Sequence, residues 1–566
     1  MVIKPILIIR DSSLMVPVIE PQKEDSSVFS EYQAVMIEDT VFHTLDTAPA
    51  DATCVIAGSN RVTYGELRVQ ALAIAEGLRS AGIKRGDTAA LWIPNVPQWL
   101  SIAYACARIG VSILPLNMRY GPRELQDFLS RSHAEALFYV PTYRGINYED
   151  CLLKLDECAL QSMKVVISLE GECNARIPGA RSLTLTALMS HVSANPVATQ
   201  AGKAQDPFVV FASSGTTSKP KLICHLQESV SRHARDVDAA FDIGPDSRLL
   251  LSVPFGGAFG FTIAQAALSG HATLIVQEQF DPREAAQLLQ QHRVTHMFGT
   301  DDMLDKILDA AGNDTRFPDL KLYGHANFTP ALSVILPAKA AERGVFLRGC
   351  YGLSESMALF ASQPAAASLN RRAMSGGLPT SPFAKVRIRS LESGNLVAAG
   401  ETGEIEIYSP NLTVGYLNDS EATSKAFGSD GFLRTGDMGY LMPDGGVTLL
   451  SRIGDILRIG GYLVNPLEIE ETVIGLGHIA ACQVIAVDTA GSVRPVAFVI
   501  GEPGYVHDEI SMIAACRSRL ATYKVPIRIF EVESFPIIES ANGGKVKKNV
   551  LRELALKLMS EEKSTS

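Results

Sequence analysis

The stretch FVVFASSGTTSKPK, residues 208–221, joins an apolar run to a loop of small hydroxyl residues, glycine and lysine. Because such a loop carries few bulky side chains, its backbone amides and hydroxyls can turn toward phosphate oxygens, while the lysines neutralise negative charge. It lacks the Gly-Lys-Ser/Thr sequence of a Walker loop at the required spacing. Taken alone, the segment is either a phosphate-binding loop of another type or an ordinary Ser/Thr/Gly turn.

Helical patterns alternate with short apolar runs on both sides of this loop. A capped helix starts after residue 62, stops at the turn 82–87 and leads into a strand at 89–93. A second helix at 99–109 is followed by a buried strand at 111–116. Further runs rich in β-branched or aromatic residues lie at 136–140, 164–168 and 272–276. This alternation predicts an α/β fold with mostly parallel sheets in αβαβα layers.

The pattern changes in the last third of the chain. After residue 375, short strands with close turns predict an antiparallel sheet or a small β-barrel. From residue 455 on, an order resembling βαββαβ suits a separate small α+β domain. We therefore expect a flexible N-terminal extension at 1–37, a large domain at 38–453 and a small mobile domain at 454–566.

The composition excludes several classes of protein. With 61 acidic and 51 basic residues the formal net charge is −10, so no global positive field favours nucleic acid. Hydrophobic residues make up 46% and charged residues 20% of the chain, which supports a large buried core and excludes wholesale disorder. A length of 566 residues argues for at least two packed units and against a small binding module.

The cysteines and apolar runs indicate the compartment. Nine cysteines form no CxxC pair and no metal-ligand cluster, so we expect reduced thiols in a cytoplasmic protein. No run reaches the roughly 18 apolar residues of a membrane span, and residues 3–10 are too short and too interrupted for a signal peptide. We expect a monomer or a homodimer.

Five further motifs follow the loop along the chain. They are YGLSE at 351–355, RTGD at 434–437, RIGD at 452–455, GYLVNPLEIE at 461–470 and GK at 544–545. In this order and at this spacing, the series resembles the adenylate-forming superfamily of acyl-CoA synthetases, adenylation domains and luciferases, over residues 38–556. The resemblance implies two half-reactions. A carboxylate attacks the α-phosphorus of ATP to give an acyl-adenylate and pyrophosphate, and a nucleophile, usually the thiol of coenzyme A, then displaces AMP.

The resemblance also implies how the nucleotide is held. The Ser/Thr loop would hold the β- and γ-phosphates as a mobile lid. Tyr351 would stack on adenine, Asp437 would accept both ribose hydroxyls, and Arg452 would support the ribose. The implied nucleotide- and coenzyme-contacting residues are Ser213, Ser214, Gly215, Thr216, Thr217, Lys221, Tyr351, Gly352, Ser354, Asp437, Arg452, Gly461 and Tyr462.

The metal and the catalytic residues follow from the same resemblance. Glu355 and Thr216 would bind Mg²⁺, a hard cation that prefers oxygen ligands and bridges phosphates. Lys545 would reach from the small domain to the carboxylate and the α-phosphate, where it stabilises the charge of the transition state. Gly461 and Tyr462 would line the channel for the pantetheine arm of coenzyme A.

Outside the ordered series, each of these residues has a plainer interpretation. Glu355 is then an exposed glutamate, Asp437 a turn aspartate and Lys545 one member of a solvated basic run. The sequence GLSES at 352–356 begins like the nucleophile elbow GxSxG of esterases, but it ends in serine and no oxyanion motif accompanies it. The order of the motifs therefore favours adenylation.

The chain departs from the family pattern in several places. Ser218 and Leu222 replace glycines of the phosphate loop, and the Cβ atom of Ser218 restricts positive φ, which stiffens the lid. The stretch before Lys545 is longer than in relatives. Gly454 stands where many relatives carry Asp or Lys, and glycine suits a large rotation at a hinge near 453–455.

The acid is predicted to be hydrophobic. Where relatives carry Pro-Leu-Phe-His, this chain has PFGGAFG at 254–260, which removes an aromatic or imidazole gate and opens space between the phenylalanines. The absence of an acidic residue from 255–261 disfavours an α-amino acid, because its ammonium group would lack a counter-charge. A fatty, alicyclic or aromatic acid fits better. The predicted substrate-binding residues are Phe255, Gly256, Gly257, Phe259, His325, Ala326 and Met357. Of these, His325 has a second interpretation as a satisfied structural histidine.

We therefore expect an ATP- and Mg²⁺-dependent ligase that joins a hydrophobic carboxylic acid to coenzyme A. One alternative is the same adenylation followed by transfer to an amine or to a carrier-protein thiol. A third, non-enzymatic alternative is a nucleotide-binding regulator with a dead site, suggested by Ser218, Leu222 and the displaced Lys545.

Overall fold

The computed structural model describes most of the chain. Its described residues are 4–7, 15–18, 40–175, 177–190, 201–212, 220–327, 332–455, 457–459, 462–489, 492–505, 507–540 and 543–565. Within the predicted extension 1–37, strands β1 (Lys4–Leu7) and β2 (Met15–Val18) form an antiparallel pair. The flexibility of this extension stays a prediction.

The first of two large sheets has eight strands in the order β11-β10-β7-β5-β6-β12-β13-β23. The strands from β11 to β12 run parallel, whereas β13 and β23 are antiparallel to their neighbours. The strands are β5 (Thr88–Trp92), β6 (Ser112–Pro115), β7 (Ala136–Tyr139), β10 (Val165–Ser168), β11 (Arg181–Thr184), β12 (Pro207–Ala212), β13 (Leu222–Leu226) and β23 (Gly415–Tyr416). The predicted strands near 89–93, 111–116, 136–140 and 164–168 are confirmed.

The second large sheet has thirteen strands, in the order β21-β22-β24-β25-β20-β19-β18-β17-β16-β14-β15-β3-β4. Its parallel section runs from β18 to β3. These strands are β3 (Thr53–Ala57), β14 (Arg248–Leu251), β15 (Thr273–Val276), β16 (His296–Thr300), β17 (Leu322–Ala326) and β18 (Leu347–Tyr351), with β4 (Asn60–Thr63) at the edge. The strand predicted at 272–276 is therefore confirmed as β15.

Local sequence explains why the flanking helices start and stop where they do. Helix α3 (Tyr64–Ser80) begins with a capping box between Thr63 and Glu66, and α4 (Pro97–Ile109) ends at Gly110, whose φ of 68° suits glycine. Helix α9 (Ala258–Ser269) is buried on nearly every side. Together with α8 (Gln227–Phe241) it lies between the two large sheets, because α8 contacts β12 and β13 while α9 contacts β14 and β15.

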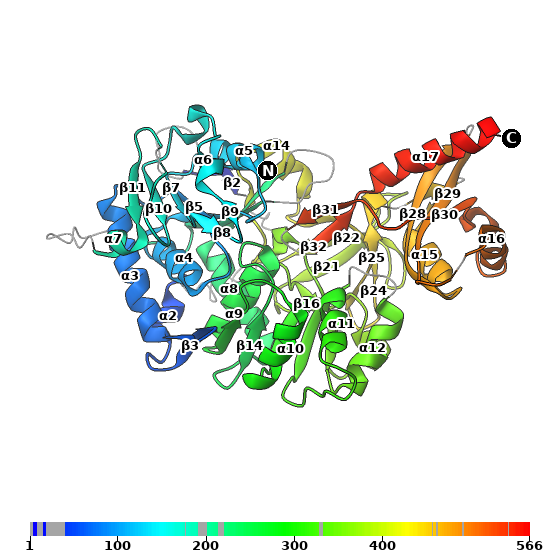
Figure 1. The fold of residues 1–566 in the computed structure, drawn as a ribbon, viewed down its shortest axis with the longest axis horizontal. Coiled ribbons are helices and arrows are strands. Elements are labelled where there is room, and N and C mark those ends of the chain that lie inside the picture. Colours follow the sequence, from blue (N-terminus) through cyan, green and yellow to red (C-terminus); the bar gives the residue numbers. More distant parts are fainter. Residues whose placement is uncertain are drawn as a thin grey trace.

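The remaining helices of this part, all before residue 455, lie outside the two large sheets or in the connections between strands (Figure 1). They are α2 (His43–Thr47), α5 (Pro122–Ser132), α6 (Glu149–Leu152), α7 (Leu185–Ser190), α10 (Pro282–Gln291), α11 (Asp301–Ala310), α12 (Leu332–Glu342), α13 (Leu369–Arg372) and α14 (Ser420–Ala426). A short strand pair, β8 (Thr142–Tyr143) with β9 (Ile146–Asn147), completes it.

The antiparallel strands predicted after residue 375 form one end of the second sheet. They are β20 (Gly376–Pro379), β21 (Lys385–Arg389), β22 (Gly403–Tyr408), β24 (Leu433–Leu441) and β25 (Val447–Arg452), and the short strand β19 (Ala361–Ser362) joins them to β18. Their side chains have a hydrophobic cluster of their own, which includes Ile388, Ile405 and Ile407. Among the described residues β21 is the edge strand, so the antiparallel prediction is confirmed and the strands form an open end instead of a closed barrel.

The C-terminal part is smaller and lies at one end of the molecule, coloured orange to red in Figure 1. A three-stranded sheet of β28 (Ile479–Thr489), β29 (Ser492–Gly501) and β30 (Arg528–Glu531) packs with α15 (Pro466–Ile474), α16 (Glu509–Arg517) and α17 (Lys548–Thr565). Two strand pairs accompany it: β26 (Leu457–Ile459) with β27 (Tyr462–Val464), and β31 (Ile537–Ser540) with β32 (Gly543–Val546). The chain thus combines a large multi-sheet α/β part with a small C-terminal α/β part.

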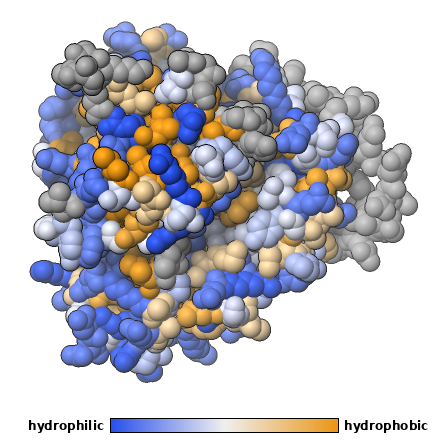
Figure 2. All heavy atoms as spheres, turned by 90° about the vertical axis from the view of Figure 1, so that its right-hand side faces the viewer, coloured by the Kyte–Doolittle hydropathy of each residue, from blue (hydrophilic) through white to orange (hydrophobic). Residues whose placement is uncertain are grey.

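The hydrophobic clusters separate along the same line. Two clusters contain only residues from 41 to 447, and two others only residues from 457 to 555. Figure 2 views the end that carries the C-terminal part and shows apolar side chains scattered among polar ones. Among the described residues, no helix is long and apolar enough to cross a membrane.

Candidate active site

The predicted phosphate loop connects two neighbouring strands of the first sheet. Strand β12 ends at Ala212, which pairs with Leu222 at the start of the antiparallel strand β13. Residues Ser213, Ser214, Gly215, Thr216, Thr217 and Ser218 lie outside the described residues. Of the predicted loop contacts, Lys221 is described, and its Nζ lies 4.4 Å from the centre of the Tyr416 ring. Leu222, the second departure from the family pattern, is a buried strand residue.

The YGLSE motif follows the carboxyl end of a parallel strand, where α/β proteins commonly bind ligands. Tyr351 is the last residue of β18, and its hydroxyl donates a hydrogen bond of 2.7 Å to Oδ2 of Asp437. Burial and the adjacent Asp437 charge hold the pKa of Tyr351 well above its usual range. At neutral pH the hydroxyl therefore keeps the proton that it donates.

Asp437 and Arg452 face each other on neighbouring strands. They are paired in the register of β24 and β25, and Arg452 Nε lies 2.9 Å from Asp437 Oδ1. The guanidinium also donates to the backbone oxygen of Thr435 over 3.1 Å. Asp437 is 3% exposed, so this buried charge is compensated by Arg452 and Tyr351, as a buried carboxylate requires. The structure thus brings together three predicted nucleotide contacts from motifs that lie up to a hundred residues apart.

Strand β22 supports the backbone around Asp437 through hydrogen bonds. The Thr435 hydroxyl donates to the Ile405 carbonyl over 2.7 Å and accepts from the Asp437 amide over 3.1 Å. Gly436 has a φ of 69°, which favours glycine, and its amide donates to Glu404 Oε1. These bonds fix the direction in which the Asp437 side chain leaves the strand.

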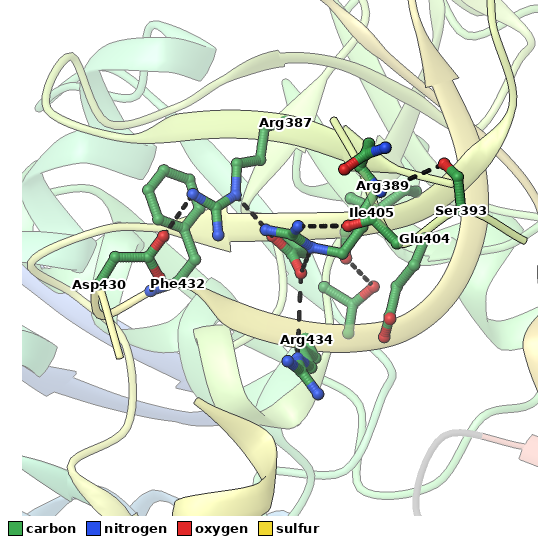
Figure 3. Close-up of polar contacts among 12 residues, drawn as sticks. Arg387, Arg389, Ser393, Glu404, Ile405, Asp430, Phe432 and Arg434 are labelled. Atoms are coloured by element: carbon green, nitrogen blue, oxygen red, sulfur yellow. Dashed lines mark hydrogen bonds and ion pairs between the residues drawn. The ribbon is translucent and has the colours of Figure 1, made fainter. Parts of the chain in front are cut away.

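The arginine of RTGD, Arg434, contacts Glu406 of the same supporting strand, β22. Figure 3 shows Arg387, Arg389 and Arg434, which lie in the same region of the sheet. Arg387 and Arg389 donate to the carboxylate of Glu406, and Arg434 Nε lies 3.9 Å from its Oε1. Burial by itself would raise the pKa of Glu406, but hydrogen bonds from Arg389 and Arg387 outweigh burial and lower it. Sequence similarity alone could not separate the role of this arginine from that of Asp437, the predicted ribose contact three residues later.

Glu355 lies in a short 3₁₀ turn, Ser354–Ser356, directly after the motif glycine Gly352. Its Oε1 accepts a 3.0 Å hydrogen bond from the hydroxyl of Tyr416, and its backbone oxygen accepts from the Thr413 amide. Burial, followed by the charge of Glu355, raises the pKa of Tyr416, which therefore stays a neutral donor. Tyr416 links Glu355 to Lys221, and no sequence motif considered above pointed to it.

An unusual turn follows Glu355. Met357, Ala358 and Leu359 have φ values of 56°, 56° and 41°, so three consecutive residues other than glycine are left-handed. Such a conformation costs L-residues about 1–2 kcal/mol each, and it persists only where the surroundings enforce it. Gly352 allows the turn to pack closely, because a Cβ atom there would lie 2.6 Å from the carbonyl carbon of Ala358.

The predicted acid pocket is only partly accessible. Phe255 is buried and stacks on Trp99 with ring centroids 5.1 Å apart, and Phe259 is 8% exposed. Gly256 is half-buried, whereas Gly257 is a buried N-cap residue of α9. Met357 belongs to the left-handed turn, and its carbonyl accepts from Thr262 of α9. We retain the pocket as a prediction.

His325 and Ala326 lie at the carboxyl end of β17. His325 is buried between Gly299 of β16 and Gly349 of β18 in the strand register. Burial lowers the pKa of His325 to about 4, so its imidazole is neutral at physiological pH. Among the described residues, neither ring nitrogen of His325 has a hydrogen-bond partner. This does not support the interpretation as a satisfied structural histidine, and the role of His325 in substrate binding stays a prediction.

Lys545, the predicted catalytic lysine, belongs to a hairpin of the C-terminal part. In the pairing of β31 with β32, Lys545 faces Ile538, and the strands are joined by residues 541–542, outside the described part. The longer stretch before Lys545 is thus a β-hairpin. Tyr462 lies in β27, Gly461 is outside the described residues, and the side chains of Lys545 and Tyr462 are likewise not described. Whether they enter the site stays a prediction.

Comparison with known proteins shows the family to which the chain belongs. A family model described as "AMP-binding enzyme" matches residues 41–417. A 3-[(3aS,4S,7aS)-7a-methyl-1,5-dioxo-octahydro-1H-inden-4-yl]propanoyl:CoA ligase from Mycobacterium tuberculosis is 31% identical over 89% of this chain and 96% of its own length. A feruloyl-CoA synthase from an Amycolatopsis species is 30% identical over 88% and 95%. The solved structure of ATP-bound MatB from Rhodopseudomonas palustris covers 92% of this chain and 99% of its own, with a TM-score of 0.79 at 24% identity. The chain therefore belongs to the family of AMP-binding enzymes.

Proposed function

We propose that this protein activates a hydrophobic carboxylic acid with ATP and transfers the acyl group to coenzyme A. The observation that carries the proposal is the buried contact of Tyr351, Asp437 and Arg452 at the carboxyl end of β18. Its sequence relatives are named as CoA ligases that act on an alicyclic propanoate and on ferulate. Both names fit an acid with a bulky apolar body.

The nucleotide would be held by groups that are already in position. Asp437 is an acceptor-only carboxylate whose oxygens contact Tyr351 and Arg452, and a carboxylate offers two acceptor atoms that suit the two ribose hydroxyls. The ring of Tyr351 would stack on adenine while its hydroxyl stays on Asp437. Lys221 and the loop at 213–217 would hold the β- and γ-phosphates.

The residues also fit a magnesium ion that bridges protein and nucleotide. Among the described residues, no three His, Cys, Asp or Glu side chains form a metal-binding group. Mg²⁺ is commonly held by one or two carboxylates together with substrate phosphates, and Glu355 supplies one carboxylate. When bound, the ion would neutralise charge on the phosphates as pyrophosphate leaves. Tyr416 would hold the Glu355 carboxylate in one orientation for this purpose.

The acid would attack the α-phosphorus of ATP through its carboxylate oxygen, and pyrophosphate would leave. Lys545 would stabilise the charge that develops on the transferring phosphoryl group. Residues 255–261 lack an acidic side chain that could pair with an amino group. This favours fatty, alicyclic and aromatic acids over α-amino acids.

In the second half-reaction, the adenylate must contact a different part of the small domain than in the first. We propose that the large domain, 38–453, and the small domain, 454–566, rotate against each other, so that Gly461 and Tyr462 approach where Lys545 had been. The separation of the hydrophobic clusters between residues 447 and 457 supports this boundary. The thiol of coenzyme A would then attack the acyl carbon and displace AMP.

A screen for acid-dependent exchange between pyrophosphate and ATP tests the proposal. The panel contains ferulate, cyclohexanecarboxylate, octanoate, 2-succinylbenzoate and phenylalanine, each with Mg²⁺. We expect exchange with at least one apolar acid and, after addition of coenzyme A, its thioester by mass spectrometry. An amide without thioester when amino acids are supplied would favour transfer to an amine, and no exchange with any acid would favour a dead nucleotide-binding regulator.

A further inference from the structure

The segment that follows Glu355 is held by side chains that the adenylation scheme does not use. Three successive carbonyls of the left-handed turn 357–359 each accept a hydrogen bond from a different element. Thr262 of α9 donates to Met357, His233 of α8 donates to Ala358 over 3.0 Å, and Thr380 donates to Leu359 over 3.0 Å. The turn also has backbone bonds of its own, from the Ala358 amide to the Leu353 carbonyl and from the Met357 amide to the Ser354 carbonyl. Because three successive left-handed residues are strained, the bonds from the three side chains add to its support.

A second histidine holds the other end of the same segment. His225 of β13 lies with Nε2 2.8 Å from the backbone oxygen of Ser354, one residue before Glu355. Because a carbonyl oxygen only accepts, both histidines must carry their hydrogen on Nε2. Burial lowers the pKa of His225 to about 3 and that of His233 to about 4, so both rings are neutral donors at physiological pH.

The held segment carries several predicted site residues. Between the two histidine contacts lies Glu355, the predicted magnesium ligand, and the turn adds Met357, a predicted wall of the acid pocket. The turn also rests against Gly352, where a Cβ atom would approach the Ala358 carbonyl carbon to 2.6 Å. A shift of the turn would therefore move Glu355 and the backbone behind Tyr351 together.

We propose that His233 is a positioning residue for adenylation, which holds the turn 357–359 and through it fixes Glu355 for the magnesium-bound nucleotide. The inference rests on the proposed function and adds to it a residue that does not touch the substrate. His233 is 3% exposed and lies on α8, outside all the sequence motifs.

Two substitutions separate the hydrogen bond from the volume of the ring. His233→Leu removes the donor, whereas His233→Gln places an amide NH₂ near the position of Nε2 and can still donate. The chain offers a matched control in His296, a buried histidine whose Nε2 lies 3.0 Å from the Phe241 carbonyl. His296 is the first residue of β16, and its acceptor Phe241 is the last residue of α8, so His296→Leu loses a similar bond at the end of the same helix without touching the turn 357–359.

The full-length variants are compared by two measurements: MgATP binding by calorimetry without acid, and exchange as a function of Mg²⁺ with the acid preferred by the wild type. We expect His233→Leu to raise the half-saturating Mg²⁺ concentration about tenfold, because small misplacements of catalytic groups are costly. His233→Gln should return it to within about threefold of the wild type, since the donor is restored. His296→Leu should match the wild type in the Mg²⁺ titration.

The outcomes separate this inference from the proposed function. A wild-type protein that neither binds MgATP nor exchanges pyrophosphate overturns the proposed function. A functional wild type in which His233→Leu behaves like His296→Leu, or in which glutamine does not restore the titration, overturns the positioning role alone. If His233→Leu does not fold, Thr262→Val removes the neighbouring bond to Met357, and an unchanged Mg²⁺ titration in that variant overturns the inference.

Discussion

At the scale of single residues, Asp437 is the centre of the candidate site. Tyr351 contacts one oxygen of the Asp437 carboxylate and Arg452 contacts the other, so the orientation of the carboxylate is fixed without a bound nucleotide. Such pre-orientation reduces the entropy lost on binding. The carboxylate is buried and its partners come from different elements, so each partner can be removed separately.

Tyr351→Phe tests whether the tyrosine positions Asp437 in addition to stacking. The ring remains, but the hydrogen bond to a charged group is lost, which is worth about 1.5–3 kcal/mol. We expect the KM for ATP to rise about tenfold or more, since each 1.4 kcal/mol corresponds to a factor of ten. Tyr351→Ala, which also removes the ring, should be clearly worse. Equal KM values for the phenylalanine variant and the wild type would confine Tyr351 to stacking.

Glu355→Gln tests the predicted magnesium ligand. The amide keeps the size of the side chain and an acceptor oxygen for Tyr416, but it loses the charge that a hard cation prefers. We expect a higher Mg²⁺ requirement in pyrophosphate exchange, with Tyr416→Phe shifted in the same direction but less. An unchanged metal titration in Glu355→Gln would remove this residue from the metal site.

At the scale of secondary-structure elements, the hairpin β31–β32 and the predicted hinge near 453–455 each carry a prediction about how the two parts cooperate. The hairpin accounts for the longer stretch before Lys545 and places that lysine in a strand. Glu470 of the GYLVNPLEIE motif is buried, accepts from the Val484 amide over 2.8 Å and lies 3.6 Å from Lys548 Nζ. Glu470 of this motif therefore has contacts that stabilise the C-terminal part.

Lys545→Ala tests the role of the hairpin in the first half-reaction. Loss of a charge-stabilising contact in the transition state typically costs about 10²–10³ in rate. We expect adenylate formation to fall by this factor, while thioester formation from a supplied acyl-adenylate stays largely intact. Single-turnover assays of both half-reactions measure this, and an equal loss in both would show that Lys545 has a different role.

Gly454→Ala tests the hinge. In this structure, a Cβ atom at Gly454 would meet no atom within 4 Å, so alanine fits the present conformation. If a large rotation requires backbone angles that only glycine adopts readily, the variant should lose thioester formation and keep adenylation. Gly244→Ala is the matched control, because its Cβ would also meet open space. Thioester rates that are the same for both variants would place the hinge elsewhere.

At the scale of the whole molecule, buried neutral histidines couple stability to pH. Burial lowers the folded-state pKa to about 3 for His225 and to about 4 for His233, against about 6.5 in the unfolded chain. A group with a lowered folded pKa that must stay neutral contributes stability above pH 6.5. This contribution is lost as pH falls below 6.5, because only the unfolded chain takes up the proton.

We therefore expect the free energy of unfolding to fall between pH 6.5 and pH 4.5, by about 1.4 kcal/mol per pH unit for each such histidine. Urea unfolding at a series of pH values measures the slope. In His233→Gln, the slope of the unfolding free energy against pH should be smaller by the contribution of one proton. Near pH 7.5, the slopes of the variant and the wild type should agree. Identical slopes across the acid range would show that His233 is protonated in the folded protein.

Much of the architecture could be predicted from sequence, because buried strands and amphipathic helices carry local patterns. The capping box at Thr63 and Glu66 and the apolar run of β7 are examples. The contact between Glu355 and Tyr416 could not be predicted, because it joins residues 61 positions apart without a spacing rule. Likewise, nothing in the residue types at 357–359 indicates a left-handed turn, since Met, Ala and Leu all disfavour it.

The sequence by itself determined the family, the order of the motifs and the residue types that adenylation needs, since these depend on local composition and order along the chain. Only the tertiary structure decided which motif residues face Asp437, that Arg434 supports Glu406, and that His225 and His233 hold the segment around Glu355. The physical reason is that these roles depend on burial and on hydrogen bonds between distant elements. Such contacts are fixed by packing, which no short stretch of sequence specifies.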